Sequence, residues 1–395
     1  MGDFQQADFR ITWMNKFSID NKALFYPEVS SLLDFNYDIS SMPKSYNLKG
    51  FVNIEYVITL LSGHKDACLL VDKNVYKEYL KGNIDIDSSR IYLVEACEEV
   101  KNIDTVLEIC RFFAGNNINK ASNVFVLGGG VLQDLGGTAS YLFKRGVPWT
   151  YLPTTLLGIA DSCLGGKTAV NFDNYKNLLG LFSAPKEVIL CPDFLKTLSD
   201  EHLSCGYGEI YRLALTGGEK SFHIMELNLE KAMTGDRDAI KNLIISSLLV
   251  KKAVIEEDEY EINIRKSMNY GHTVGHAIEG LSDFKIPHGI GVCIGIQIEN
   301  RLALKLGLMS EELCARFLGP AKLILQQSVI DILMGISFED IGEHLRKDKK
   351  TVGNNFNFSY IARMGEMHFS FNDIDETKSL IIQAKDDILR DLSVE

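Results

Sequence analysis

The chain has 395 residues, of which 46% are hydrophobic and 24% charged, a composition typical of a globular protein with a sizeable core. Its formal net charge of −12 disfavours a duplex nucleic-acid binder, because such proteins usually carry a basic face. No apolar run approaches the roughly 20 residues that a membrane span needs. We therefore expect neither a nucleic-acid nor a membrane partner.

Short apolar runs and helical periods alternate through the first half of the chain. The segments Ala67–Asp72, Arg90–Ala96, Asn123–Gly130 and Trp149–Leu157 are predicted as strands. Between the second and third of them, apolar residues recur at helical spacing and the pattern closes on Gly115, which predicts a helix. This order predicts a parallel sheet flanked by helices.

From about Pro192 the pattern changes to long segments of helical period, such as residues 239–258 and 288–309. They predict a second, mainly helical domain, on which the last 50 residues are expected to pack. We place the boundary within Ser183–Asp193, dividing the chain into residues 1–188 and 189–395.

The eight cysteines form no CxxC pair, and most lie among apolar neighbours. This usage is typical of reduced, buried thiols. The first ten residues lack the apolar stretch of a secretory signal. A cytoplasmic protein is therefore expected.

A glycine-rich turn follows the third predicted strand at Gly128, Gly129 and Gly130. Glycines there let the backbone approach a phosphate, and the N-terminus of the following helix offers N–H groups to it. Asp72, at the end of an earlier strand, can accept hydrogen bonds from ribose hydroxyls, and Asn74 lies two residues on. The alternatives are a tight turn without a ligand and an Asp that caps a turn.

Cationic and polar residues are concentrated between Lys144 and Gly180, and the segment GGKTAVN within this run lacks the spacing of a P-loop. Lys and Arg side chains bind phosphate by charge and by N–H donors. The run predicts an anion site; the alternative is a solvated loop with ordinary lysines.

His272 and His276 lie four residues apart in a stretch that reads as helix, so they share a face. The HExxH glutamate of zinc proteases is absent. With His288 and Glu209, two histidines and one carboxylate would form a recognised catalytic zinc set. Spacing alone does not decide which two histidines are ligands, and each could also be an ordinary core or surface residue.

Taken together, these motifs resemble a known family. The stretches GGGVLQDLGG, LPTTLLGIADSCLGGKTAVN, KNLLG, GEIYRLAL, EDEYEINIRKSMNYGHTVGHAIE and PHG occur in the order seen in 3-dehydroquinate synthase and its relatives, the sugar phosphate cyclases. The resemblance covers residues 72–350 approximately. It implies an α/β N-terminal Rossmann-like domain that binds NAD⁺, an all-α C-terminal domain that binds Zn²⁺ or Co²⁺, and a homodimer.

The resemblance also implies roles for individual residues. The metal ligands would be Glu209, His272 and His288, and His276 would contact the substrate or its phosphate. The NAD⁺ contacts would be Asp72, Asn74, Glu98, Lys101, Gly128, Gly129, Gly130, Asp134, Thr154 and Thr155, with Asp161 and Lys176 lining the cofactor and substrate cleft. The phosphate contacts would be Arg145, reaching across from the partner subunit, Lys167, Asn177 and Arg212. Around the substrate carboxylate would lie Lys251, Arg265 and Lys349, with Asn269 beside the metal.

Four features depart from the family pattern. Arg212 stands where 3-dehydroquinate synthases usually have a Lys that faces the phosphate, and the larger planar head of Arg is not equivalent. Gln133 replaces a usual Gly, Ile290 stands where many members have Glu, and the N-terminal extension is longer. These departures fit a divergent member.

The implied substrate is a keto-sugar phosphate. Because Lys251 and Arg265 suit a carboxylate, we favour 3-deoxy-D-arabino-heptulosonate 7-phosphate. It would be converted to 3-dehydroquinate and phosphate by NAD-dependent oxidation, phosphate elimination, reduction and intramolecular aldol closure, which is a carbon–oxygen lyase reaction of the shikimate pathway to aromatic amino acids.

Three alternatives remain. The first is another sugar phosphate cyclase, of the 2-epi-5-epi-valiolone synthase, 2-deoxy-scyllo-inosose synthase or amino-dehydroquinate synthase type. The second is a metal-dependent NAD alcohol or glycerol dehydrogenase, against which the GGKTAVN run and the pair Lys251 and Arg265 argue. The third is a non-catalytic relative, against which the candidate metal set argues.

Overall fold

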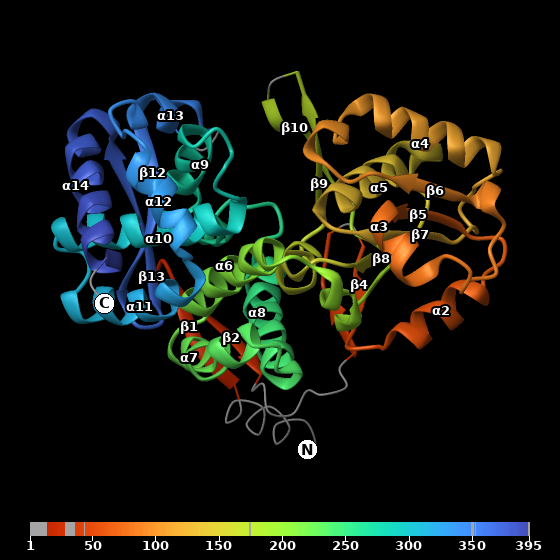
Figure 1. The fold of residues 1–395 in the computed structure, drawn as a ribbon, viewed down its shortest axis with the longest axis horizontal. Helices are drawn as coiled ribbons and strands as arrows, with labels where there is room; N and C mark the ends of the chain where they lie inside the picture. The colour runs from red at the N-terminus through yellow and green to blue at the C-terminus, as the bar shows by residue number, and fades with distance from the viewer. Residues whose placement is uncertain are drawn as a thin grey trace, which may run out of the picture. The chain divides into compact units, whose positions relative to one another are not determined.

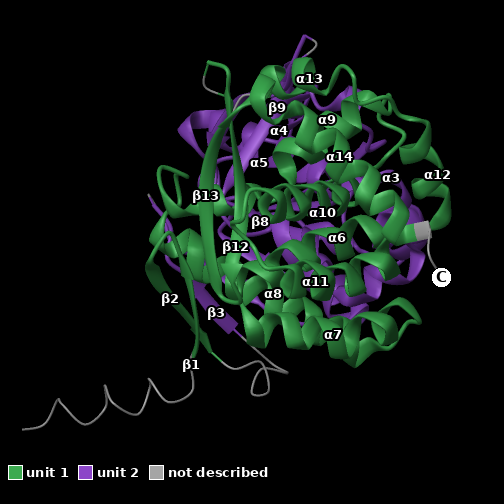
Figure 2. Ribbon diagram, turned by 90° about the vertical axis from the view of Figure 1, so that its left-hand side faces the viewer, with its two compact units in different colours: residues 1–29, 204–395 green, residues 30–203 purple. Residues whose placement is uncertain are grey.

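A computed structural model of the protein describes residues 14–27, 36–42, 44–173, 175–348, 351 and 353–393. The chain divides into two compact units, coloured in Figure 2. The sheet unit (purple) is Ser30–Leu203, and the helical unit (green) is Ser204–Glu395 with Met1–Val29. The break between Leu203 and Ser204 lies after the Ser183–Asp193 boundary placed by sequence, and Met1–Val29 groups with the helical unit because an N-terminal strand pairs with a C-terminal one.

The sheet unit contains a seven-stranded sheet in the order β3-β4-β11-β8-β7-β5-β6. Only β3 and β4 pair antiparallel in this sheet, so the predicted parallel sheet is confirmed. Its strands are β3 (Asn36–Ile39), β4 (Tyr46–Lys49), β5 (Cys68–Asp72), β6 (Ile91–Val94), β7 (Val124–Gly128), β8 (Trp149–Pro153) and β11 (Glu187–Ile189). Because both faces of β7 are covered, all its residues are buried.

Helices cover the two faces of this sheet (Figure 1). Val57 and Leu61 of α2 pack in one core with Leu69 and Leu127 of the sheet, while α5 packs against the opposite side chain of Val126. The helices are α2 (Ile54–Ser62), α3 (Lys73–Val75), α4 (Ile103–Gly115) and α5 (Gly130–Leu142), with helical turns η2 (Tyr76–Leu80), η3 (Ser88–Arg90), η4 (Glu98–Val100), η5 (Phe143–Arg145), η6 (Gly158–Ser162) and η7 (Pro192–Thr197).

The predicted anion-binding run contains an element that sequence patterns did not predict. Strands β9 (Lys167–Phe172) and β10 (Tyr175–Phe182) pair antiparallel as a separate two-stranded sheet. Most of β10 is exposed, so its side chains carry no alternating burial pattern that would mark a strand.

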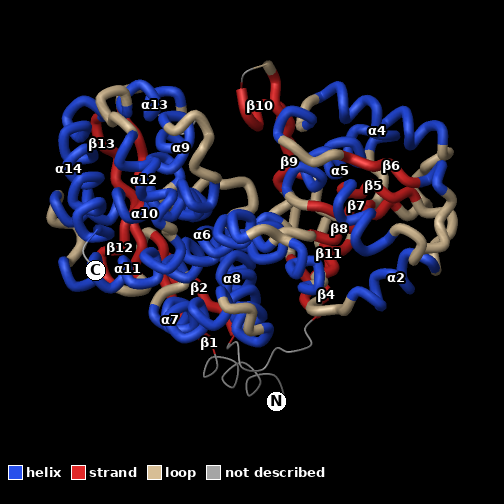
Figure 3. Tube along the Cα trace, viewed as in Figure 1, coloured by secondary structure: helices blue, strands red, loops and turns tan. Residues whose placement is uncertain are grey.

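The helical unit is mainly helical, as expected (Figure 3). Its helices are α6 (Asp200–Thr216), α7 (Glu219–Met233), α8 (Arg237–Glu257), α9 (His272–Leu281), α10 (His288–Lys305), α11 (Glu311–Ile324), α12 (Gln327–Gly335), α13 (Ile341–Lys347) and α14 (Ile374–Ser393), with the turn η8 (Ile264–Asn269). In the described part of the chain no single helix has the length and apolarity of a membrane span, although the bent pair α11 and α12 would pass by those two criteria alone.

The helical unit also holds a four-stranded sheet, which corrects the expectation of an all-α domain. Its order is β12-β13-β1-β2, formed by β12 (Asn355–Arg363), β13 (Glu366–Asp373), β1 (Met14–Ile19) and β2 (Lys22–Pro27). β1 runs parallel to β13, with Ser18 opposite Glu366. Because the pairing joins the two ends of the chain, neither segment signals the sheet by itself.

Candidate active site

Three helices of the helical unit meet through close backbone contacts. A Cβ atom on Gly208 of α6 would lie 2.0 Å from the carbonyl oxygen of Gly289, and one on Gly289 would lie 1.9 Å from that of Cys205. Only glycines permit this approach between α6 and α10. It brings Glu209, the neighbour of Gly208, beside His288, the neighbour of Gly289 and the first residue of α10.

A second contact of the same kind joins α9 to α10. A Cβ on Gly295 would lie 2.0 Å from the carbonyl oxygen of Gly271, which caps α9 with a left-handed φ of 76°. The predicted helix across the two histidines is confirmed, and His272 is its first residue. The first turn of α9 is thereby placed against α10, with its histidines beside His288.

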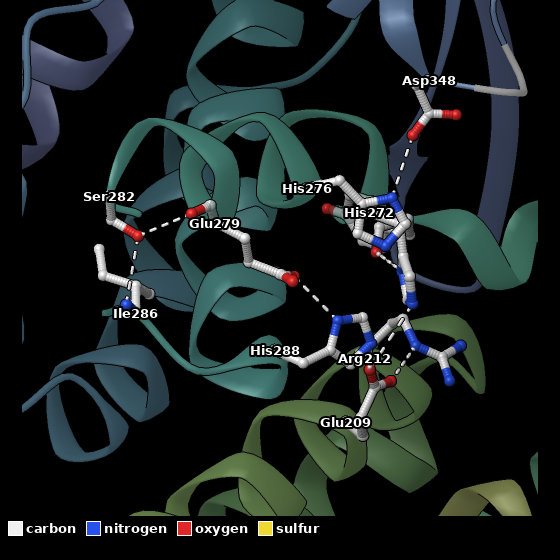
Figure 4. A network of polar contacts seen from close by, with 10 residues as sticks. Glu209, Arg212, His272, His276, Glu279, Ser282, Ile286, His288 and Asp348 are labelled. Carbon is white, nitrogen blue, oxygen red and sulfur yellow. Dashed lines mark hydrogen bonds and ion pairs between the residues drawn. The ribbon is translucent and has the colours of Figure 1, made fainter. Parts of the chain in front are cut away.

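These contacts bring three candidate metal ligands close together (Figure 4). The Nε2 atoms of His272 and His288 lie 3.6 and 3.3 Å from Oε1 of Glu209, and the three ligand atoms all lie within 4.8 Å of one another. Zn²⁺ ligands at about 2.1 Å in tetrahedral geometry lie about 3.4 Å apart. The donor set and its spacing therefore fit a divalent metal.

Each candidate ligand is oriented by a partner outside the cluster. His288 Nδ1 lies 2.9 Å from Oε1 of Glu279, His272 Nδ1 lies 3.3 Å from the carbonyl oxygen of Tyr270, and Arg212 Nε donates to Oε2 of Glu209 at 2.6 Å. Such partners fix the tautomer and orientation of metal-binding histidines, leaving Nε2 for the metal. This arrangement is the one that a metal centre requires.

The electrostatics of the cluster favour positive charge. Burial acts to raise the pKa of Glu209, but Arg212, His272 and His288 hold that pKa well below its usual range. Burial acts to lower the pKa of His288, but hydrogen bonds to Glu209 and Glu279 raise it to about 10. Carboxylates that favour a charge on His288 also favour a divalent cation between the same ligands.

His276 lies beside the cluster, with its ring stacked on that of His288 at 5.6 Å between centroids. Its Nδ1 lies 3.0 Å from Oδ2 of Asp348, a carboxylate with only 5% of its side chain exposed. With Nδ1 directed to Asp348, Nε2 is the atom that can act on a substrate. The ligand atoms of His276, Glu279 and His288 also lie within 4.8 Å of one another, so the geometry alone allows a second metal set, and the role of His276 beside the substrate stays a prediction.

The residues expected around a substrate carboxylate lie on α8 and η8, which contact each other. Lys251 of α8 and Arg265 of η8 are both buried. Asp258 accepts hydrogen bonds from the N–H groups of Ile262, Asn263 and Arg265, which orders the loop between these elements. Asn269 donates to Oε1 of Glu261 at 2.5 Å. Lys349 lies outside the described residues.

In the sheet unit, Asp72 and the glycine turn end the adjacent strands β5 and β7. The strand order reverses there, since β6 lies on one side of β5 and β7 on the other, and open α/β sheets bind ligands at such points. Asp72 Oδ1 also accepts from the N–H groups of Asn74 and Val75, so the Asp caps a helix, as the alternative proposed.

The glycine turn fits a phosphate group. No side chain caps α5 at Gly129, so the first N–H groups of a long helix face outward without a capping partner. A Cβ on Gly130 would meet no atom within 4 Å. Thr154 N–H donates to the carbonyl oxygen of Gly128, and a Cβ on Gly129 would lie 2.9 Å from Cγ2 of Thr155, so both threonines contact the turn.

Four predicted site residues form one polar network in the sheet unit. Lys101, which is 7% exposed, donates to Oδ1 of Asn177 at 2.6 Å and pairs with Glu98 at 3.3 Å and Asp134 at 3.1 Å. Burial raises the pKa of Asp134 to about 6, against the opposing effect of Lys101. Lys101 therefore joins η4, α5 and the β9–β10 hairpin.

The remaining predicted residues are distributed along the anion-binding run. Asp161 lies in η6, Lys167 begins β9, and Lys176 is exposed on β10. Arg145 has a φ of 59° and follows Lys144 with a φ of 50°. Two consecutive non-glycine residues in the left-handed region are uncommon, and such strain is concentrated at functional sites.

Two residues of the candidate site were missed by the sequence analysis. Glu279 lies three residues after His276 and seven after His272, so helical spacing alone places it on the same face. Asp348 is 72 residues from His276, and no local pattern connects them. Gln133, noted as a departure, bonds Ser162 through both ends of its amide, which links α5 to η6.

Comparison with known proteins gives matches over most of the chain. A family model for the 3-dehydroquinate synthase N-terminal region matches residues 91–205, and one for the C-terminal region matches residues 206–351. A 3-dehydroquinate synthase from Pelagibacter ubique is 33% identical over 325 residues, which are 80% of this chain and 88% of that protein.

Solved structures share the fold. A crystal structure of 2-deoxy-scyllo-inosose synthase complexed with carbaglucose-6-phosphate, NAD⁺ and Co²⁺ has a TM-score of 0.75 and 22% identity, and covers 88% of this chain and 100% of that one. The 2-epi-5-epi-valiolone synthase of Streptomyces hygroscopicus subsp. jinggangensis, with NAD⁺ and Zn²⁺ bound, has a TM-score of 0.72 and 24% identity, with coverages of 90% and 100%.

Proposed function

This chain belongs to the 3-dehydroquinate synthase family, and we propose that it converts 3-deoxy-D-arabino-heptulosonate 7-phosphate to 3-dehydroquinate and phosphate. One observation carries the proposal beyond family membership. The helical unit holds, besides the metal-ligand cluster, two buried cations, Lys251 and Arg265. Such cations suit a substrate that bears a carboxylate.

The proposal assigns the chemistry to bound groups and the positioning to the chain. A divalent metal would polarise substrate oxygens and NAD⁺ would accept and return a hydride. Glu209, His272 and His288 would hold the metal, and the N-terminus of α5 would hold the pyrophosphate of the nucleotide. The Lys101 network would fix the edge of the nucleotide site, with Asp72, Thr154 and Asp161 near the cofactor. Holding a flexible substrate through several steps is mainly a task of orientation.

The polar residues around the substrate would divide by the group that they bind. The phosphate would be bound by Arg145, Lys167 and Asn177, with Lys176 nearby, and a phosphate so bound leaves readily because its charge is neutralised. His276, oriented by Asp348, would donate or accept a proton through Nε2. Lys251, Arg265 and Lys349 would bind the carboxylate. A substrate without a carboxylate would not form these charge-assisted hydrogen bonds.

We also propose a cytoplasmic homodimer. All eight cysteines are free in the structure, which suits a reducing compartment. Phe172, Tyr175 and Leu178 of the β9–β10 hairpin are 45%, 66% and 56% exposed, an apolar surface on an edge strand that a second copy could cover. Light scattering of the purified protein tests the dimer.

The test of the proposed function is phosphate release by the purified protein with NAD⁺ and Zn²⁺ or Co²⁺, while NADH is followed in parallel. Release from the heptulosonate phosphate alone, without accumulation of NADH, is the expected result. Release from sedoheptulose 7-phosphate or glucose 6-phosphate instead would assign another cyclase activity. NADH formed from simple polyols without phosphate release would assign a dehydrogenase.

A matched pair of neighbouring lysines tests the carboxylate assignment. Lys251→Met should raise KM for the heptulosonate phosphate by about 10- to 100-fold, since a hydrogen bond to a charged group contributes about 1.5–3 kcal/mol. Lys252→Met is the control, because Lys252 is less buried and pairs with Glu256 on the same helix. Equal effects of the two substitutions would contradict the assignment.

A further inference from the structure

The two carboxylate oxygens of Glu209 have separate partners. Oε1 faces the Nε2 atoms of His272 and His288, whereas Oε2 accepts from Arg212 Nε at 2.6 Å. Arg212 lies one helical turn after Glu209 on α6, and both side chains are about 2% exposed. Arg212 and Glu209 therefore form a close, buried ion pair in which the guanidinium donates to Oε2.

Arg212 is itself held in place. Its Nη1 lies 3.3 Å from Sδ of Met268 in η8, so the guanidinium contacts a second element as well as Glu209. It is among the largest fully buried side chains of the described chain. A planar guanidinium with one nitrogen on a carboxylate and another on a neighbouring segment has little freedom to rotate.

A carboxylate can bind a metal through one oxygen or through both. To bind through both, Glu209 would have to turn Oε2 away from Arg212 and break a buried charge-assisted bond, which is unfavourable. The arrangement therefore favours binding through Oε1 alone. A metal held by two histidine nitrogens and one oxygen keeps positions open for substrate atoms.

We propose that Arg212 is a positioning residue that keeps Glu209 a single-oxygen ligand of the divalent metal, and thereby keeps the coordination positions not used by the protein available to substrate oxygens. The inference rests on the proposed function for the identity of those oxygens. The metal geometry can be measured without substrate, so that part of the inference does not depend on the proposed function.

The test uses the Co²⁺-loaded protein and its visible absorption, which weakens as the coordination number of Co²⁺ rises. Arg212→Met removes the donor, while Arg212→Gln places an amide nitrogen at the position of Nε and removes the charge. We expect the Met variant to lose at least half of the absorption intensity and the Gln variant to retain it. Arg316→Met is the control, because Arg316 pairs with Glu219 and Glu226 and not with the metal cluster, and it should keep the wild-type spectrum.

Wild-type intensity in the Met variant, or equal loss in both Arg212 variants, would overturn the proposal. If Arg212→Met does not fold, a crystal structure of the metal-loaded wild-type protein decides, since two Glu209 oxygens on the metal would also overturn it. In the phosphate-release assay, kcat/KM should fall at least 100-fold in Arg212→Met and less than 10-fold in Arg212→Gln. Spectral changes as expected in a protein that releases no phosphate would support this inference while refuting the proposed function.

Discussion

Substitution of Gly289 by Ala tests the idea that glycine contacts assemble the metal site. The new Cβ would lie 1.9 Å from the carbonyl oxygen of Cys205 and 2.8 Å from its Cα, where contacts below 3.0 Å are essentially never seen. The first turn of α10 must therefore retreat by about 1 Å from α6, which moves His288 away from Glu209. A displacement of this size can cost about 100-fold in function, and disturbed ligand support costs about 10- to 100-fold in metal affinity.

The assay is a Zn²⁺ titration against a chromophoric chelator, together with urea unfolding. Overpacking should also lower the free energy of unfolding by about 1–3 kcal/mol. Gly335→Ala is the matched control, because a Cβ there meets no atom within 4 Å and Ala at the last residue of α12 should be neutral or stabilising. If Gly289→Ala binds Zn²⁺ as tightly as the wild-type protein, the glycine contacts do not set the ligand geometry.

Three further predictions concern stability and the metal. The folded pKa of Asp134, about 6, lies above the unfolded value of 3.8, so the stability from its protonated form is present below about pH 4 and lost as the pH rises through 6. The free energy of unfolding of Asp134→Asn, relative to that of the wild type, should therefore rise by about 3 kcal/mol from pH 4 to pH 7. Urea unfolding at the two pH values measures this change, and a constant difference would contradict the prediction. Lys101→Met should cost about 1–3 kcal/mol, because Asp134, the more buried of its two carboxylate partners, loses its cation. Lys73→Met, which breaks an exposed ion pair with Glu95, should cost less than about 1 kcal/mol, and similar costs would refute the network. Removal of metal with EDTA should lower Tm by about 3 °C, if metal at 100 times its Kd contributes about 2.7 kcal/mol and the 395-residue chain unfolds as one unit, and an unchanged Tm would argue against a metal in the folded protein.

Sequence patterns were informative where burial repeats at short range. The strands β5 and β7 are buried on both faces, so each appears as a continuous apolar run that ends in a polar or glycine residue. The helix α10 is buried around most of its circumference, and the predicted segment 288–309 covers its whole length and ends four residues after it. The i, i+4 spacing likewise predicted that His272 and His276 share a face, because helical geometry alone decides it.

Other features depend on pairings between distant segments. The sheet that joins β1 to β13 brings together residues near the two ends of the chain, and the exposed β10 shows no periodic burial. The contact of His276 with Asp348 spans 72 residues. No local pattern encodes such contacts, because they depend on how close two backbones come.

By itself, the sequence determined which segments are buried, which residues share a helical face, and which donor types are available for a metal and an anion. These properties follow from periodicity and side-chain chemistry. Only the tertiary structure decided that Glu209, His272 and His288 meet on one oxygen, that Arg212 faces that carboxylate, and that Lys101 joins three elements. Glycine contacts between helices set the distances within the metal-ligand cluster to tenths of an ångström. A linear pattern of residues does not specify distances at that scale.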